Sequence, residues 1–117
     1  MNKIVRKFSF AFKGLIYGLA HDGSIRLQFF CALGGIAAGI TFHFTIEEMA
    51  IVLGFCAQVI ALEYVNSAIE EIMNLEEPEI NEKVGHIKDI SAAAVLIASI
   101  FALITGLLFI ARHVFGW

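Results

Sequence analysis

The chain has 117 residues, of which 59% are hydrophobic, and its mean hydropathy is +0.82. A soluble domain of this length has too little interior to bury so much apolar surface, so the composition predicts a single integral membrane domain covering residues 1–117. The formal net charge of −3 argues against nucleic acid as a partner. Cys31 and Cys56 lie within apolar runs, and we interpret them as small hydrophobic residues rather than a disulfide or a zinc site.

Residues 3–21 are predicted to form an amphipathic surface helix. Apolar side chains recur on one side at helical spacing, and basic side chains recur on the other. Such a basic amphipathic helix before a membrane span typically lies in the plane of the interface. Phe10 falls on the polar side. We favour packing of Phe10 against a neighbouring subunit, and contact with a flat ligand is the alternative.

Three runs without a charged residue follow, at 27–46, 49–62 and 90–111. The first and third are long enough to cross a bilayer, which takes about 20 residues of helix. The second reaches that length only if its helix continues into a more polar segment, which predicts spans of about 27–46, 49–74 and 89–111. The fold class expected is therefore all-α, with the surface helix followed by three transmembrane helices.

Lysine and arginine are distributed unequally between the two sides of these spans. Seven of them precede the first span or lie between the second and third, and only Arg112 follows the third span. Cytoplasmic segments of membrane proteins carry the excess of basic residues. We therefore expect the N-terminus and the 74–89 segment to lie in the cytoplasm.

A polar stripe marks the predicted cytoplasmic end of the second span. At about 100° per residue, its members fall within an arc of roughly 100° on one helix face. They are Glu63, Asn66, Ser67, Glu70 and Asn74. Ionisable groups next to the membrane core are costly and usually face a bundle interior or a functional site. By contrast, Glu47 and Glu48 are interpreted as loop charges on the outer side, and His113 as an interfacial residue.

The residues near this stripe are suited to phosphoryl transfer. Glu63, the member closest to the lipid, is placed to accept a proton from a lipid hydroxyl. Glu70 and Asp22 offer oxygen ligands of the kind that Mg²⁺ prefers, and Lys88 suits phosphate as a point charge. The sequence has no glycine-rich phosphate loop, which excludes a P-loop fold. The alternative from another class is a non-catalytic three-span assembly or interaction protein, of which an ion-conducting oligomer is a weaker variant.

Two strings resemble a known family. EYVNSAIE at 63–70, followed by KDISAAAV at 88–95, resembles the small prokaryotic diacylglycerol kinases, a family that also contains undecaprenol kinases. The resemblance covers nearly the whole chain. It implies a homotrimer in the bacterial inner membrane that uses ATP and Mg²⁺ to phosphorylate a membrane lipid alcohol, at cytoplasmic sites shared between subunits. Diacylglycerol and undecaprenol both remain open as the substrate.

The resemblance also assigns roles to individual residues. Glu63 corresponds to the catalytic glutamate, and Asp22 and Glu70 correspond to the metal-binding carboxylates. The nucleotide-contacting positions correspond to Lys3, Phe10, Asn66, Glu79, Asn81, Lys88 and Asp89. The chain departs from the usual family pattern at four places. Asp22 replaces a glutamate, Asn74 an aspartate, Lys3 an arginine, and Phe10 a tyrosine or other polar-face aromatic residue.

Overall fold

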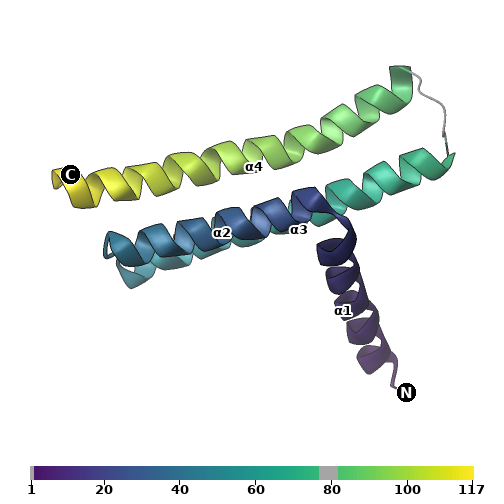
Figure 1. The fold of residues 1–117 in the computed structure, drawn as a ribbon, viewed down its shortest axis with the longest axis horizontal. Coiled ribbons are helices and arrows are strands. Elements are labelled where there is room, and N and C mark those ends of the chain that lie inside the picture. The colour runs from purple at the N-terminus through teal and green to yellow at the C-terminus, as the bar shows by residue number, and fades with distance from the viewer. Residues whose placement is uncertain (1, 77–81) are drawn as a thin grey trace.

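Four helices make up the part of the chain that the computed structural model describes, residues 2–76 and 82–117. They are α1 (Lys3–His21), α2 (Gly23–Thr41), α3 (Ile46–Glu76) and α4 (Glu82–Phe115). Helices α2, α3 and α4 run alongside one another, and α1 leaves the start of α2 at a steep angle (Figure 1). The last three helices are each long and apolar enough to cross a membrane. The prediction of an all-α protein with three membrane-spanning helices is thereby confirmed.

The corner between α1 and α2 consists of one residue, Asp22. Its backbone N–H donates to the Gly18 carbonyl at 2.9 Å, and its carboxylate accepts the backbone N–H groups of Ser24 at 2.9 Å and Ile25 at 3.2 Å. Aspartate is a favoured N-cap because it satisfies such unpaired N–H groups at a helix start. Arg26 secures the other side of the corner by donating to the carbonyl of Leu19 at 2.8 Å.

The helix ends do not coincide with the ends of the charge-free runs. Helix α2 begins at Gly23 and ends at Thr41, where a span of 27–46 was predicted, and α4 extends from Glu82 to Phe115, beyond the predicted 89–111. For α2, the reason is that backbone capping at Asp22 and Phe42, rather than the first charge, sets the helix ends. Helix α3 starts at Ile46 rather than residue 49 because Thr45 and Glu48 form a reciprocal capping box, with bonds of 2.8 and 3.1 Å.

The interpretation of Glu48 as a loop charge was wrong. Glu48 is only 3% exposed, and its carboxylate lies 2.7 Å from Nε2 of His113 and 3.4 Å from Nη1 of Arg112. The Phe44 ring stacks on His113 with 5.6 Å between ring centroids. These residues form what we name the far-end cluster, which ties the end of α4 to the turn between α2 and α3.

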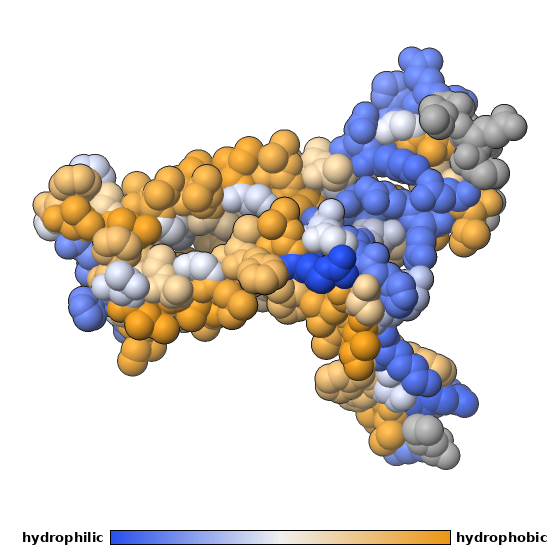
Figure 2. Space-filling model, viewed as in Figure 1, coloured by the Kyte–Doolittle hydropathy of each residue, from blue (hydrophilic) through white to orange (hydrophobic). Residues whose placement is uncertain are grey.

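On the face shown in Figure 2, apolar side chains cover most of the three-helix bundle, and polar ones gather at the end from which α1 departs. The buried hydrophobic residues of the described chain are few: Ile25, Val52, Val59, Val84 and Val95. An exposed apolar surface of this extent is expected where lipid tails or other transmembrane helices cover it. The protein is therefore a multi-pass membrane protein with its polar stripe at the hydrophilic end.

Candidate active site

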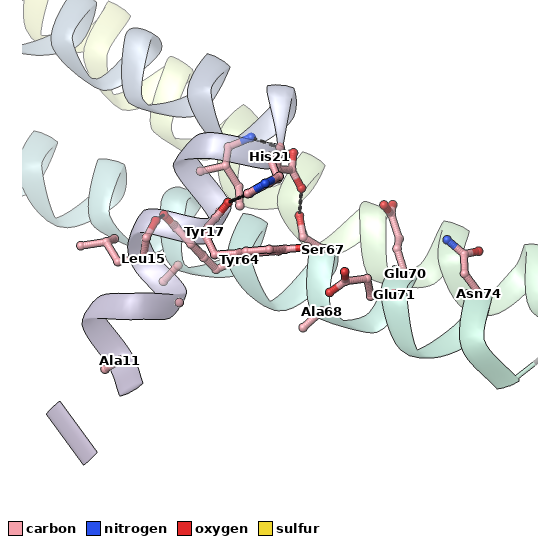
Figure 3. A pocket seen from close by; sticks show the side chains of 15 residues that line it. Ala11, Leu15, Tyr17, His21, Tyr64, Ser67, Ala68, Glu70, Glu71 and Asn74 are labelled. Carbon is pink, nitrogen blue, oxygen red and sulfur yellow. Dashed lines mark hydrogen bonds between the residues drawn. The ribbon is translucent and has the colours of Figure 1, made fainter. Parts of the chain in front are cut away.

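A cavity of about 740 Å³ lies in the angle between α1 and the last third of α3 (Figure 3). Small residues of α1 line one side of the cavity, among them Gly14 and Gly18. Its polar and aromatic lining includes Tyr17, His21, Asp22, Ser67, Glu70 and Asn74. The cavity thus contains both carboxylates that the resemblance assigns to a metal ion.

Tyr64 and Gly18 hold α1 against α3 at the edge of this cavity. The Tyr64 hydroxyl points toward α1 (Figure 3) and donates to the Leu15 carbonyl at 2.7 Å. Gly18 is buried, and a Cβ atom at that position would run into the Tyr64 ring and the Ile25 side chain. The absence of a side chain at residue 18 therefore allows the two helices to approach each other. Neither contact was predicted, although a glycine inside a helical pattern is a weak signal of close packing.

Glu63 and Asn66 are the deepest members of the polar stripe. They are 6% and 7% exposed, and the side chains of Gln28 and Asn66 interact with Glu63. Asn66 also donates from Nδ2 to Oε1 of Glu70 at 3.3 Å. Glu63 therefore lies beside the cavity, on the side of α2. Its interaction with Asn66, which in turn hydrogen-bonds Glu70, connects Glu63 to the cavity lining.

Asp22 is joined to the stripe by a hydrogen bond from the Ser67 hydroxyl to Oδ2 (Figure 3). This bond is the main reason that the pKa of Asp22 lies below its ordinary value, although partial burial acts in the opposite direction. The backbone N–H groups of Ile25 and Ser24, together with the Arg26 charge, also lower this pKa. Asp22 is therefore ionised at neutral pH.

Lys88 approaches the same region from α4. Its Nζ donates to Oδ1 of Asn74 at 2.5 Å. The Lys88 ammonium group therefore lies at the end of the polar stripe that is farthest from Glu63. Asp89, next to Lys88, is exposed. Glu79 and Asn81 lie outside the described residues.

The structure does not bring Lys3 or Phe10 into the cavity. Both are exposed residues of α1, and Phe10 is 61% exposed. Nζ of Lys13 lies 5.6 Å from the centroid of the Phe10 ring. Phe10 does share a helix face with the cavity-lining residues Gly14, Tyr17 and His21, because their spacings of four, three and four residues follow the helical repeat.

The donors around the cavity fit Mg²⁺ held jointly with a nucleotide. Within residues 2–76 and 82–117, no three His, Cys, Asp or Glu side chains lie close enough to hold a metal ion by themselves. Mg²⁺, however, commonly takes only one or two protein carboxylates and completes its shell with water and substrate phosphates. Asp22 and Glu70 are carboxylates that line the cavity. In addition, the buried Oδ1 of Asn66 has no hydrogen-bond partner in the described chain, which leaves one more oxygen available.

Fold and site together define a small multi-pass membrane protein whose spans gather carboxylates, a hydroxyl and a lysine at their hydrophilic end. Residues 9–110 match the family described as prokaryotic diacylglycerol kinase. The chain therefore belongs to this family of membrane lipid kinases.

Individual relatives agree with this assignment. The chain is 30% identical over 100 residues to a diacylglycerol kinase of Synechocystis sp., an alignment that covers 85% of this chain and 57% of the relative. It is 26% identical over 111 residues to the diacylglycerol kinase of Escherichia coli strain K12, which covers 95% of this chain and 91% of the relative. The diacylglycerol kinase of Shigella flexneri gives the same values. The chain thus spans little more than half the length of the Synechocystis protein.

Proposed function

We propose that this protein transfers the γ-phosphoryl group of ATP to the primary hydroxyl of a membrane lipid alcohol. The substrate is diacylglycerol, giving phosphatidic acid, or undecaprenol, giving undecaprenyl phosphate. The observation that carries the proposal is the burial of Glu63 within a membrane-spanning helix, directly beside a cavity that contains Asp22 and Glu70. Membership of the prokaryotic diacylglycerol kinase family supplies the reaction class.

In the proposed reaction, Glu63 acts as the general base. The oxygen of the lipid hydroxyl attacks the γ-phosphorus, the bond from this phosphorus to the β–γ bridging oxygen breaks, and ADP leaves. The hydroxyl proton passes to the Glu63 carboxylate. Because Glu63 lies nearest the apolar part of α3, it is the carboxylate that a lipid alcohol reaches without leaving the bilayer.

The remaining residues bind and neutralise the nucleotide. Phosphoryl transfer depends mainly on positioning and on neutralisation of charge. Asp22 and Glu70 would hold Mg²⁺, which when bound offsets the negative charge of the phosphates. Lys88 lies next to Asn74, at the end of the polar stripe farthest from Glu63. Its positive charge would there interact with the phosphates. Asn66, Asp89, Glu79 and Asn81, together with Lys3 and Phe10 of α1, are proposed as further nucleotide contacts.

We place the site at the cytoplasmic face of the bacterial inner membrane, with α1 lying in the interface. The distribution of lysine and arginine supports this orientation. The side of α1 that carries most of its apolar residues is turned toward the apolar part of the bundle, and its basic side is turned toward the polar end (Figure 2). An amphipathic helix in the interface plane has this arrangement.

Self-association is part of the proposal, as a homotrimer with sites shared between subunits. The large exposed apolar surface of α2 and α4 is compatible with helix contacts between copies. If sites are shared, mixing inactive Glu63→Gln chains with inactive Lys88→Ala chains is expected to restore part of the activity. The measurement is lipid phosphorylation by co-expressed, co-purified mixtures. Demonstrated mixed oligomers without any recovered activity would exclude shared sites.

The proposed function is tested by a substrate panel. Purified protein in bilayers is incubated with ATP labelled at the γ-phosphorus and with diacylglycerol or undecaprenol in parallel, with and without Mg²⁺. Transfer of label to one lipid in preference to the other identifies the substrate. If no label reaches any lipid alcohol under conditions in which the Escherichia coli relative is active, the proposed activity is wrong.

Asn74→Asp is expected to change the dependence on nucleotide and Mg²⁺ but not the preference between lipids. The structure shows Asn74 bonded to Lys88, and an aspartate would convert this bond to an ion pair that draws the lysine charge away from phosphate. The measurement is a set of kinetics on two lipids at varied ATP and Mg²⁺. A changed ratio between the lipids, with unchanged nucleotide kinetics, would place residue 74 at the lipid site instead.

A further inference from the structure

The carboxylate of Asp22 is held from two different helices. Oδ1 accepts the backbone N–H groups of Ser24 and Ile25, at the start of α2. Oδ2 accepts the hydroxyl of Ser67, which comes from α3. The first two bonds fix Asp22 relative to the start of α2, and the third fixes it relative to α3, the helix that carries Glu70.

This division matters because Asp22 lies at the corner between α1 and α2, whereas Glu70 belongs to α3. Ser67 precedes Glu70 by three residues on the same face of α3, so both side chains reach the cavity from one rigid segment. Tyr64 also connects α3 to the α1–α2 region, but its hydroxyl bonds a backbone carbonyl of α1. Ser67, by contrast, hydrogen-bonds the Asp22 carboxylate directly.

We propose that Ser67 is a positioning residue that orients the Asp22 carboxylate toward Glu70, so that oxygen donors from the α1–α2 corner and from α3 reach one divalent cation. The inference rests on the proposed function and deepens it. A hydroxyl that donates its only proton to an ionised carboxylate acts through that carboxylate. Partners of this kind, one step removed from a metal ion, typically change metal affinity by about 10–100-fold when they are removed.

The test is Mn²⁺ binding followed by electron paramagnetic resonance, with the intact protein in bilayers and a non-hydrolysable ATP analogue. Mn²⁺ is used as a spectroscopically visible stand-in for Mg²⁺. The variants are Ser67→Ala, Ser67→Thr, Asp22→Asn, Glu70→Gln and the double variant Ser67→Ala/Asp22→Asn. Ser24→Ala is the matched control, because it also removes a serine hydroxyl beside Asp22 but keeps the backbone N–H that bonds the carboxylate.

Ser67→Ala is expected to weaken Mn²⁺ binding by about 10-fold, at the lower end of that range. Ser67→Thr keeps the hydroxyl and is expected to restore most of the affinity, and Ser24→Ala is expected to bind like the parent protein. Asparagine still caps α2 but lacks the charge, so the double variant is expected to bind no more weakly than Asp22→Asn alone. The Mg²⁺ concentration for half-maximal activity is expected to follow the same order.

Two results would overturn the positioning role. Unchanged Mn²⁺ binding in Ser67→Ala with weakened binding in Asp22→Asn would leave the metal assignment intact and remove Ser67 from it. Losses that add in the double variant would mean that Ser67 acts independently of Asp22. Unchanged binding in both Asp22→Asn and Glu70→Gln would instead remove the metal site of the proposed function. If Ser67→Ala does not fold, Ser67→Cys, a weaker donor of similar size, is expected to show intermediate affinity.

Discussion

Replacing Glu63 by glutamine is expected to lower the turnover of lipid phosphorylation by about 10²–10⁴-fold, the usual range for loss of a general base. Glutamine has nearly the shape of glutamate and still accepts a hydrogen bond, but it cannot take up the hydroxyl proton. ATP binding is expected to persist, because Glu63 lies beside the cavity rather than among its lining residues. The measurements are initial rates of label transfer and, separately, binding of a fluorescent ATP analogue.

Glu47→Gln provides the control for this variant. Glu47 lies on the same helix as Glu63, and its replacement removes the same charge. Because Glu47 is exposed at the far end of α3, the turnover of the Glu47→Gln variant is expected to match that of the parent protein. Near-normal turnover of Glu63→Gln would remove Glu63 from the role of base. A loss of nucleotide binding equal to the loss of turnover would assign it to the nucleotide instead.

The second large effect is expected at Gly18. Alanine at this position places a methyl group against the Tyr64 ring and Ile25, and overpacking of this kind typically costs about 1–3 kcal/mol. The strain is relieved if α1 moves away from α3, which breaks the hydrogen bond from Tyr64 to Leu15. We therefore expect faster amide hydrogen exchange throughout α1 and a lower thermal midpoint.

Gly14→Ala is the matched control on the same helix. A Cβ atom at Gly14 meets nothing within 4 Å, and alanine favours a helix over glycine by about 1 kcal/mol. Exchange in α1 is therefore expected to slow or stay unchanged in this variant. Equal exchange rates in the two alanine variants would show that the contact between Gly18 and Tyr64 does not hold α1.

The sequence was most informative where a property repeats along one helix. The length and apolar content of 90–111 required a membrane-spanning helix, and the structure contains it within α4. The spacing of Glu63 and Asn66 predicted a common face turned away from lipid, and both are buried. These features depend on the local chain alone, so periodicity reveals them.

Contacts between distant segments were beyond the reach of such patterns. Glu48 was interpreted as a loop charge because its partners, Arg112 and His113, lie 64 and 65 residues away. The bond between Ser67 and Asp22 crosses 45 residues, and the stripe by itself gave Ser67 no role. The Glu48 contacts and the Ser67–Asp22 bond both depend on how the helices pack against one another, and the sequence of a single helix does not show this.

The far-end cluster also has a consequence for how the protein is made. A chain is synthesised from its N-terminus, so the Glu48 carboxylate enters the membrane environment before Arg112 and His113 exist. Until α4 docks, the Glu48 carboxylate of the α2–α3 hairpin lacks these two partners, and an unpaired acidic side chain in the bilayer has a high free-energy cost. Docking of α4 supplies both partners at once. The cluster thus favours an α4 that runs antiparallel to α3, because only that direction brings Arg112 and His113 to Glu48.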